Sequence, residues 1–349
     1  MKIKKQFAAS LFTSLWLACL LISPLHAAVK TPVGALVDPA AIVTTTNGIL
    51  VLEIENANTS DLGVWSVSTG ASHPNPGQRV IYPVGTSYTT FRDATALIMY
   101  GNVGGVAPGL AGYTYQNMST APGSGVVTNL ANGYRTVWTI PSWTITQDVV
   151  INGTTLSDTN VRQSLTVTNT SAAPRQYGLR FMWDWEIAGN DASFFRTRNP
   201  DGAFTSTFAT FPSPAFQLFE EVNNLTTPLF SVFGTVTGGP LVPTPTTPDQ
   251  LRYSSWTAAV GSAWDFTNTG GGSDSATEHY WGFNAPLTLA AGASATYTQY
   301  LTTNLVAGGG GGGPALGPIV VPTLSEWSVL LLIALLGGIA IWSIRRKLR

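Results

Sequence analysis

The chain has 349 residues, a formal net charge of −1 and 44% hydrophobic residues. Residues 29–305 alone carry one lysine and nine arginines against seventeen acidic residues, a net charge of about −7, so much of the positive charge lies at the two ends. Without a basic patch in its main body, the chain does not fit the class of nucleic-acid-binding proteins.

Residues 1–28 have the pattern of a secretory signal peptide. Three lysines stand within the first five residues, residues 7–22 are mostly apolar, and small residues follow at Ala27 and Ala28. We expect signal peptidase to cut after Ala27 or Ala28. The only cysteine, Cys19, lies in this leader, so the mature chain has neither disulfide nor thiol chemistry.

The body of the chain, residues 29–306, predicts an all-β ectodomain. Short runs rich in Val, Thr, Ile and aromatic residues recur between Gly, Pro, Asn or Ser. These runs are 49–55, 135–140, 143–151, 161–169, 177–187 and 296–303. We predict an antiparallel β-sandwich, built as one supersandwich or as two stacked sandwiches. Eight tryptophans in this part of the chain favour a well-packed core.

Two strand pairs are predicted from short connections. Residues 161–169 and 177–187 are joined by seven residues, a length typical of a hairpin. Residues 287–289 and 297–301 flank a second short loop and predict another hairpin with a closing strand. Residues 238–248 are too rich in Pro and Gly for a sheet interior and predict a long surface loop.

The run 177–187 carries the candidate ligand face. Its odd positions are all aromatic or aliphatic and predict a core face, because successive strand residues point to opposite sides. Arg180, Asp184 and Glu186 share the other face, and Asp191 follows in a turn. Carboxylates and carbonyls around Asp184, Glu186 and Asp191 suit Ca²⁺, and exposed tryptophan rings suit the face of a sugar. In the alternative interpretation, Arg180 simply pairs with the two acids.

Residues 177–191 are similar to a pattern in bacterial secreted β-sandwich domains, some of them resembling the galactose-mutarotase-like supersandwich. That resemblance implies a fold and no activity. We expect a head that is not an enzyme and that has no cofactor besides the Ca²⁺ just considered. Two isolated histidines, His73 and His279, are too few for a zinc site.

Two other classes of function stay open for the head. In the first, the pairs Trp138 with Trp143 and Trp256 with Trp264 form platforms for a glycan, although core positions are the more common role of tryptophan. In the second, less favoured class, the head is a carbohydrate-active enzyme. That class needs Asp184 or Glu186 to meet another acid from a distant strand.

The C-terminal region begins with a linker and ends in a predicted membrane span. Residues 307–320 contain six consecutive glycines and predict a flexible tether. Residues 327–344 are apolar, and as a helix they would be about 27 Å long, enough to cross a hydrocarbon core. The tail residues that should keep this end in the cytoplasm are Arg345, Arg346, Lys347 and Arg349.

The segment before the span resembles the bacterial IPTL-CTERM sorting domain. The matching residues are Pro322, Thr323, Leu324 and Trp327, with Val321 where Ile is usual and Ser328 where Gly is usual. The resemblance implies a protein held in the inner membrane, processed by an exosortase-type enzyme and passed to the cell surface or an extracellular polysaccharide. The alternative is a plain tail anchor.

Overall fold

A computed structural model describes residues 42–56, 61–83, 85–120 and 125–303. By internal contacts the chain divides into two units, residues 1–307 and 308–349. The predicted signal peptide, linker, sorting motif and membrane span all lie outside the described residues. Within the described ranges, no helix has both the length and the apolar character needed to cross a bilayer.

The first unit consists of three β-sheets with one short helix among its described residues, α2 (Trp256–Gly261). The small sheet contains, in spatial order, β1 (Ile42–Thr46), β2 (Leu50–Glu55), β3 (Trp65–Thr69) and β4 (Arg79–Ile81). The first large sheet contains β13 (Phe194–Arg198), β15 (Leu218–Val222), β16 (Ser231–Thr235), β20 (Ser294–Thr302), β11 (Asn160–Asn169), β10 (Trp143–Asn152), β9 (Gly133–Ile140) and β8 (Val126–Leu130). The second large sheet contains β14 (Ala209–Pro212), β17 (Gln250–Ser255), β18 (Ser275–Trp281), β12 (Arg175–Asp184), β5 (Tyr88–Asp93), β6 (Ile98–Gly101) and β7 (Thr114–Asn117), with β19 (Leu287–Leu289) paired to one end of β12.

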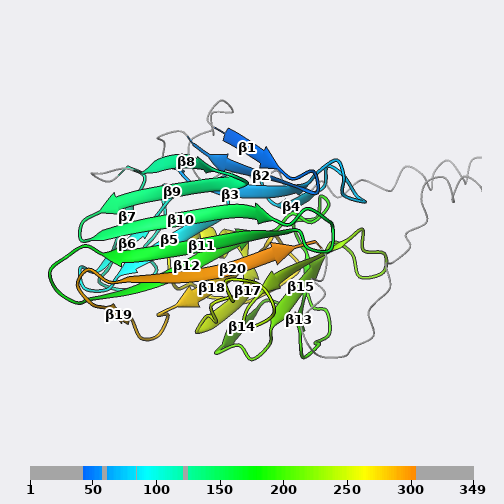
Figure 1. Ribbon diagram of the computed structural model, residues 1–349. Coiled ribbons are helices and arrows are strands. Elements are labelled where there is room, and N and C mark those ends of the chain that lie inside the picture. Colours follow the sequence, from blue (N-terminus) through cyan, green and yellow to red (C-terminus); the bar gives the residue numbers. More distant parts are fainter. Residues whose placement is uncertain (1–41, 57–60, 84, 121–124, 304–349) are drawn as a thin grey trace, which may run out of the picture. The chain divides into compact units, whose positions relative to one another are not determined.

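The two large sheets face each other as the layers of an open sandwich (Figure 1). All named pairings are antiparallel except that of β6 with β7. The small sheet extends the second layer, because Ile81 of β4 forms a bridge with Trp185, just beyond the end of β12. The predicted antiparallel β-sandwich is confirmed, and its second layer is continuous.

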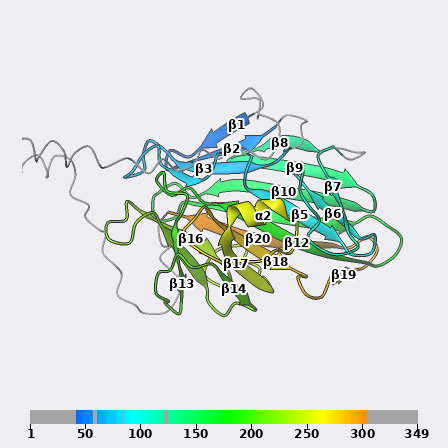
Figure 2. The same ribbon diagram turned by 180° about the vertical axis from the view of Figure 1, so that it is seen from behind.

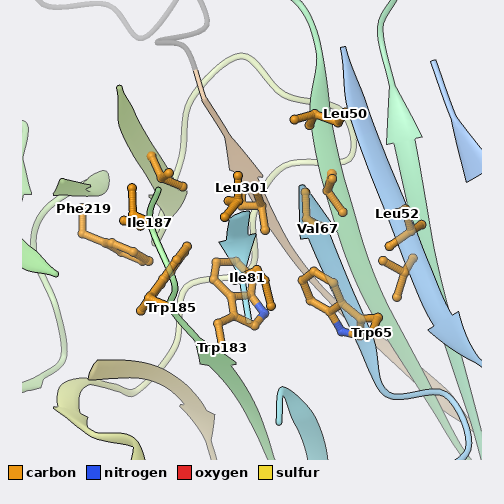
Figure 3. Close-up of a cluster of buried hydrophobic side chains, with 14 of the residues drawn as sticks. Leu50, Leu52, Trp65, Val67, Ile81, Trp183, Trp185, Ile187, Phe219 and Leu301 are labelled. Carbon is orange, nitrogen blue, oxygen red and sulfur yellow. The ribbon is translucent and has the colours of Figure 1, made fainter. Parts of the chain in front are cut away.

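Apolar residues from both layers fill the space between the sheets (Figure 3). Trp183, Trp185 and Ile187 from the β12 run pack there with Trp65 of β3 and Phe219 of β15. The odd positions of 177–187 therefore form a core face, as their alternation predicts. All eight tryptophans of the ectodomain are buried, so none of them is an exposed glycan platform.

Both predicted hairpins are wrong. β11 pairs with β10 and β20, whereas β12 pairs with β5, β18 and β19 in the opposite layer. β19 and β20 likewise lie in different sheets. The short loops cross between layers, which are only about 10 Å apart in a sandwich, so a few residues suffice.

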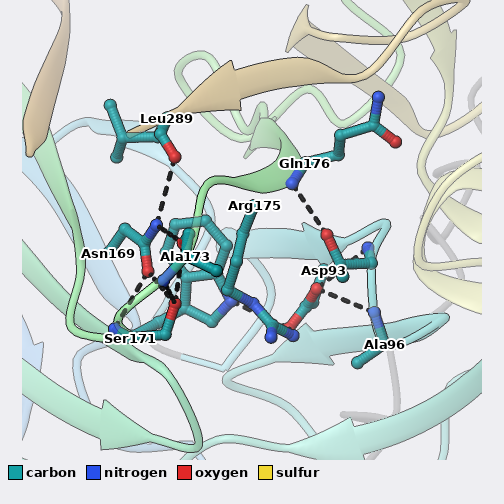
Figure 4. A network of polar contacts seen from close by, with 10 residues as sticks. Asp93, Ala96, Asn169, Ser171, Ala173, Arg175, Gln176 and Leu289 are labelled. Atoms are coloured by element: carbon teal, nitrogen blue, oxygen red, sulfur yellow. Dashed lines mark hydrogen bonds and ion pairs between the residues drawn. The ribbon is translucent and has the colours of Figure 1, made fainter. Parts of the chain in front are cut away.

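Polar side chains hold the crossing from β11 to β12 in place (Figure 4). The Asn169 side chain donates to the carbonyl oxygens of Ala173 at 2.8 Å and Leu289 at 3.1 Å. Arg175, at the start of β12, forms an ion pair of 2.8 Å with the buried Asp93 of β5. These contacts fix the place where the chain passes from one layer to the other.

Candidate functional site

The second face of β12 is covered rather than open to solvent. The segment 256–266, which includes α2, folds over the outer side of the second large sheet (Figure 2). Its side chains Trp256, Ala259 and Trp264 pack with Met182 of β12 and Tyr280 of β18. Arg180 is consequently buried completely between the sheet and this segment.

Arg180 binds only neutral oxygen atoms among the described residues. Its guanidinium donates to the carbonyl oxygens of Ala259 at 3.2 Å and Ser262 at 2.7 Å, and also to the Tyr88 hydroxyl. The same guanidinium lies 4.9 Å from the centre of the Tyr88 ring. Arg180 therefore ties the C-terminal turn of α2 to the sheet.

Glu278 of β18 is the acid of this polar cluster. It lies opposite Met182 of β12 on one side and Arg252 of β17 on the other. Its Oε1 accepts from the Ser254 hydroxyl at 2.7 Å, while Oε2 has no hydrogen-bond partner within the described part of the chain. Burial raises the pKa of the Glu278 carboxyl to about 7, although Ser254, Arg180 and Arg252 oppose the shift. A carboxyl group with this pKa can both donate and accept a proton at neutral pH.

Arg252 attaches the far end of the covering segment. It forms an ion pair of 2.7 Å with Asp265 and donates to the Phe266 carbonyl at 3.2 Å. Its guanidinium lies 4.7 Å from the ring centre of Phe283 and 5.3 Å from that of Tyr280. The cluster thus combines two guanidinium groups, a carboxyl group with a pKa of about 7 and several aromatic rings beneath the segment 256–266.

The four residues of the predicted ligand face differ in burial. Arg180 and Asp184 are buried, whereas Glu186 and Asp191 are partly exposed. Asp184 pairs in register with Ala276, and the Asp191 carbonyl accepts from the Ser275 amide at 2.7 Å, so both reach the start of β18. Arg180 itself donates to the Ala259 and Ser262 carbonyl oxygens of the covering segment.

No group of three or more His, Cys, Asp or Glu side chains that could hold a metal ion occurs among the described residues. The Ca²⁺ site stays a prediction. His279 packs in the sandwich core, 4.7 Å from the Trp183 ring, and its Nε2 lies 3.1 Å from the Thr235 carbonyl oxygen. Burial lowers the pKa of His279 to about 3, so this imidazole is neutral.

Sequence reasoning missed Glu278, Arg252 and Tyr88. Each charged residue stands inside a run of apolar and aromatic residues, as in Leu251-Arg252-Tyr253 and around Glu278. A charge within a strand of that composition is a usable signal of a buried polar cluster. Their meeting under α2 depends on two long-range strand pairings, in which Met182 of β12 lies opposite Tyr88 of β5 on one side and Glu278 of β18 on the other.

Solved structures provide a comparison of fold. A protein from Escherichia coli K12 that is proposed to be an aldose 1-epimerase shares 12% identity, with a TM-score of 0.43 over 75% of this chain and 98% of that chain. A protein from Synechocystis sp. PCC 6803 shares 10% identity, with a TM-score of 0.44 over 75% of this chain and 96% of that chain. The galactose mutarotase related enzyme from Lactobacillus acidophilus shares 11% identity, with a TM-score of 0.37 over 75% of this chain and 98% of that chain.

The comparison with these structures corrects one prediction. The expectation that the head is not an enzyme does not stand, because an enzyme and a proposed enzyme occur among the chains of similar fold. At these identities and TM-scores the similarity transfers no activity to this chain. No curated protein matches the chain in sequence.

The predicted resemblance of the C-terminal segment to the IPTL-CTERM sorting domain is confirmed by a direct match. Residues 321–346 match the IPTL-CTERM motif. The motif implies export, anchoring in the membrane and later processing by an exosortase-type enzyme. The chain is therefore similar, over these residues, to proteins that are exported and sorted through their C-terminus.

Proposed function

We propose that this chain is a cell-surface or extracellular-matrix protein that an exosortase-type enzyme releases from the inner membrane. The match at residues 321–346 is the observation that carries the proposal. In this account, signal peptidase cuts at Ala27 or Ala28, the span 327–344 holds the exported chain, and the enzyme recognises residues 321–327. The tail after the span keeps the C-terminus in the cytoplasm until that step.

The test is to follow wild type and a Pro322→Ala, Thr323→Ala double variant in the native host. The wild type should leave the inner membrane, while the variant should accumulate there, because its recognition residues are altered and its span is intact. A Ser325→Ala variant, altered between the matching residues Leu324 and Trp327, serves as the control and should behave as wild type. Equal release of all three would refute recognition through this motif.

A second candidate function is action on a saccharide at the cluster of Arg180, Arg252 and Glu278. The supporting observation is the Glu278 carboxyl, which has a pKa of about 7 and an oxygen without a partner among the described residues. A substrate reaches it only if segment 256–266 moves. Exposing Trp256 or Trp264 costs about 4–6 kcal/mol each, at 25 cal/mol per Å² of apolar surface.

The matched variants for this second candidate are Glu278→Gln and Asp148→Asn, the latter on the opposite sheet in an exposed ion pair with Arg135. Saccharide turnover should fall by about 100-fold or more in Glu278→Gln, because an acid–base group is lost. Asp148→Asn should retain wild-type turnover. Turnover is followed by NMR, and circular dichroism verifies the fold. Unchanged turnover in Glu278→Gln, or none in wild type, would refute this candidate.

A further inference from the structure

The connection between β16 and β17 carries a Pro-Thr segment on the surface of the head. Residues 243–248 read Pro-Thr-Pro-Thr-Thr-Pro, and the described structure has no strand between Thr235 and Gln250. The predicted surface loop over 238–248 therefore has no strand, as its composition indicates. Ser/Thr-rich segments with proline are typical O-glycosylation substrates in exported proteins.

Hydrogen bonds to the sheets hold this loop in one position. The Thr246 amide donates to the Thr298 carbonyl at 2.9 Å, and the Gln299 side chain donates to the Thr246 carbonyl at 2.6 Å. The Trp281 indole donates to the Thr247 carbonyl at 2.9 Å. The Tyr300 hydroxyl donates to the Pro243 carbonyl at 2.6 Å. The backbone on both sides of Thr244 is thus fixed.

The three threonines of the segment differ in what their hydroxyl groups do. Thr246 Oγ1 accepts from the Thr298 amide at 3.1 Å. Thr247 Oγ1 is hydrogen-bonded to Thr237 Oγ1. Thr244 is exposed, and its hydroxyl forms no hydrogen bond with any described residue. Only Thr244 presents an exposed hydroxyl that is free of these contacts.

The residues next to Thr244 favour an accessible, extended backbone, which a modifying enzyme could bind. Pro243 has a fixed φ, and Thr244 precedes Pro245, which favours an extended backbone at Thr244. Val242, two residues before Thr244, is 86% exposed. For an enzyme that binds extended peptides, the free-energy cost of ordering the segment around Thr244 would be small.

We propose that Thr244 is an O-glycosylation site, modified by a glycosyltransferase of the cell envelope. Thr244 Oγ1 attacks the anomeric carbon of a sugar that is linked to a nucleotide or lipid diphosphate. A carbon–oxygen bond forms to Thr244, the bond to the diphosphate breaks, and the hydroxyl proton passes to a base of the transferase. The proposal rests on the export proposed above, because the head must reach the envelope.

The test compares wild type, Thr244→Val and Thr247→Val, each recovered from the native host. Trypsin releases residues 199–252 as one peptide, since no Lys or Arg lies between Arg198 and Arg252. Mass spectrometry with electron-transfer fragmentation then locates any added sugar. Wild type and Thr247→Val should carry a glycan on residue 244, and Thr244→Val should carry none. The thermal unfolding midpoint of Thr244→Val should equal that of deglycosylated wild type.

A wild-type peptide with an unmodified Thr244 would overturn the proposal, even if another residue carries sugar. The N-terminus of the same sample separates the two claims. A processed protein without residues 1–28 and with an unmodified Thr244 would refute only the modification. A protein that retains residues 1–28 and has an unmodified Thr244 would contradict the modification and the export together.

Discussion

At the residue scale, burial raises the pKa values of two glutamates, Glu221 and Glu278. Glu221 of β15 accepts from the Ser193 hydroxyl, which lies 2.7 Å from the Ser275 hydroxyl, while its Oε1 has no partner within the described residues. Burial raises the pKa of Glu221 to about 8. At neutral pH, Glu221 and Glu278 therefore hold protons in the folded state that they have released in the unfolded chain.

These shifts predict that the head loses stability as the pH rises. Between about pH 4.5 and 8 the folded state binds more protons at Glu221 than the unfolded state, whose glutamates titrate near 4.3. The free energy of unfolding therefore falls with pH in this window, by up to about 1.4 kcal/mol per pH unit for one group. Below about pH 6.5 His279 acts in the opposite direction, because only the unfolded chain protonates it.

Urea unfolding between about pH 7.5 and 8 separates the glutamates from the histidines, because an unfolded histidine with a pKa near 6.5 is then mostly deprotonated. The pH dependence should be weaker in Glu221→Gln than in wild type, since the amide carries no titrating proton. Asp148→Asn, altered on the protein surface, should keep the wild-type slope. A Glu221→Gln slope equal to that of wild type would show that this carboxyl group ionises normally in the fold.

At the scale of elements, β12 explains both the success and the failure of sequence reasoning. Its alternation correctly predicts the core face, because residues of period two must share a side of the sheet. The partners of β12 could not be predicted, since periodicity reports faces and a short loop can either turn within a sheet or cross between layers. The burial of Arg180 could not be predicted either, because the segment that packs over it consists of residues 256–266, far away in the sequence.

This packing predicts that Arg180 controls the local stability of α2. Arg180→Ala removes the donors to the carbonyls of Ala259 and Ser262, which should weaken α2 by about 1–3 kcal/mol. Native-state hydrogen exchange should then be faster by about 5- to 150-fold for amides of α2 and Ala263. Amides of β10 and β11 should be unaffected, because Arg180 does not contact these strands.

Arg135→Ala is the matched control, because it removes an arginine from an exposed ion pair on the other layer. Its effect on α2 exchange should be negligible. Slow exchange of α2 in Arg180→Ala, as in wild type, would mean that the apolar contacts of Trp256 and Trp264 alone hold the cover.

At the scale of the whole molecule, the parts of the chain differ in how much of their function the sequence alone predicts. Sorting signals are linear, so Val321, Pro322, Thr323 and the residues after them could be interpreted without a fold, and the match at 321–346 confirms the motif. The polar cluster of Glu278, in contrast, assembles from strands far apart in the sequence. The proximity of Arg180, Arg252 and Glu278 could be recognised only from the pairing of β12, β17 and β18.

In the function proposed here, the chain is exported and then processed at its C-terminus. The most direct test is the intact mass and C-terminal residue of the protein recovered from its native host. We predict a species that has lost the leader, the span 327–344 and the tail. A mature protein that still ends at Arg349 would contradict the account and leave a plain tail anchor in its place.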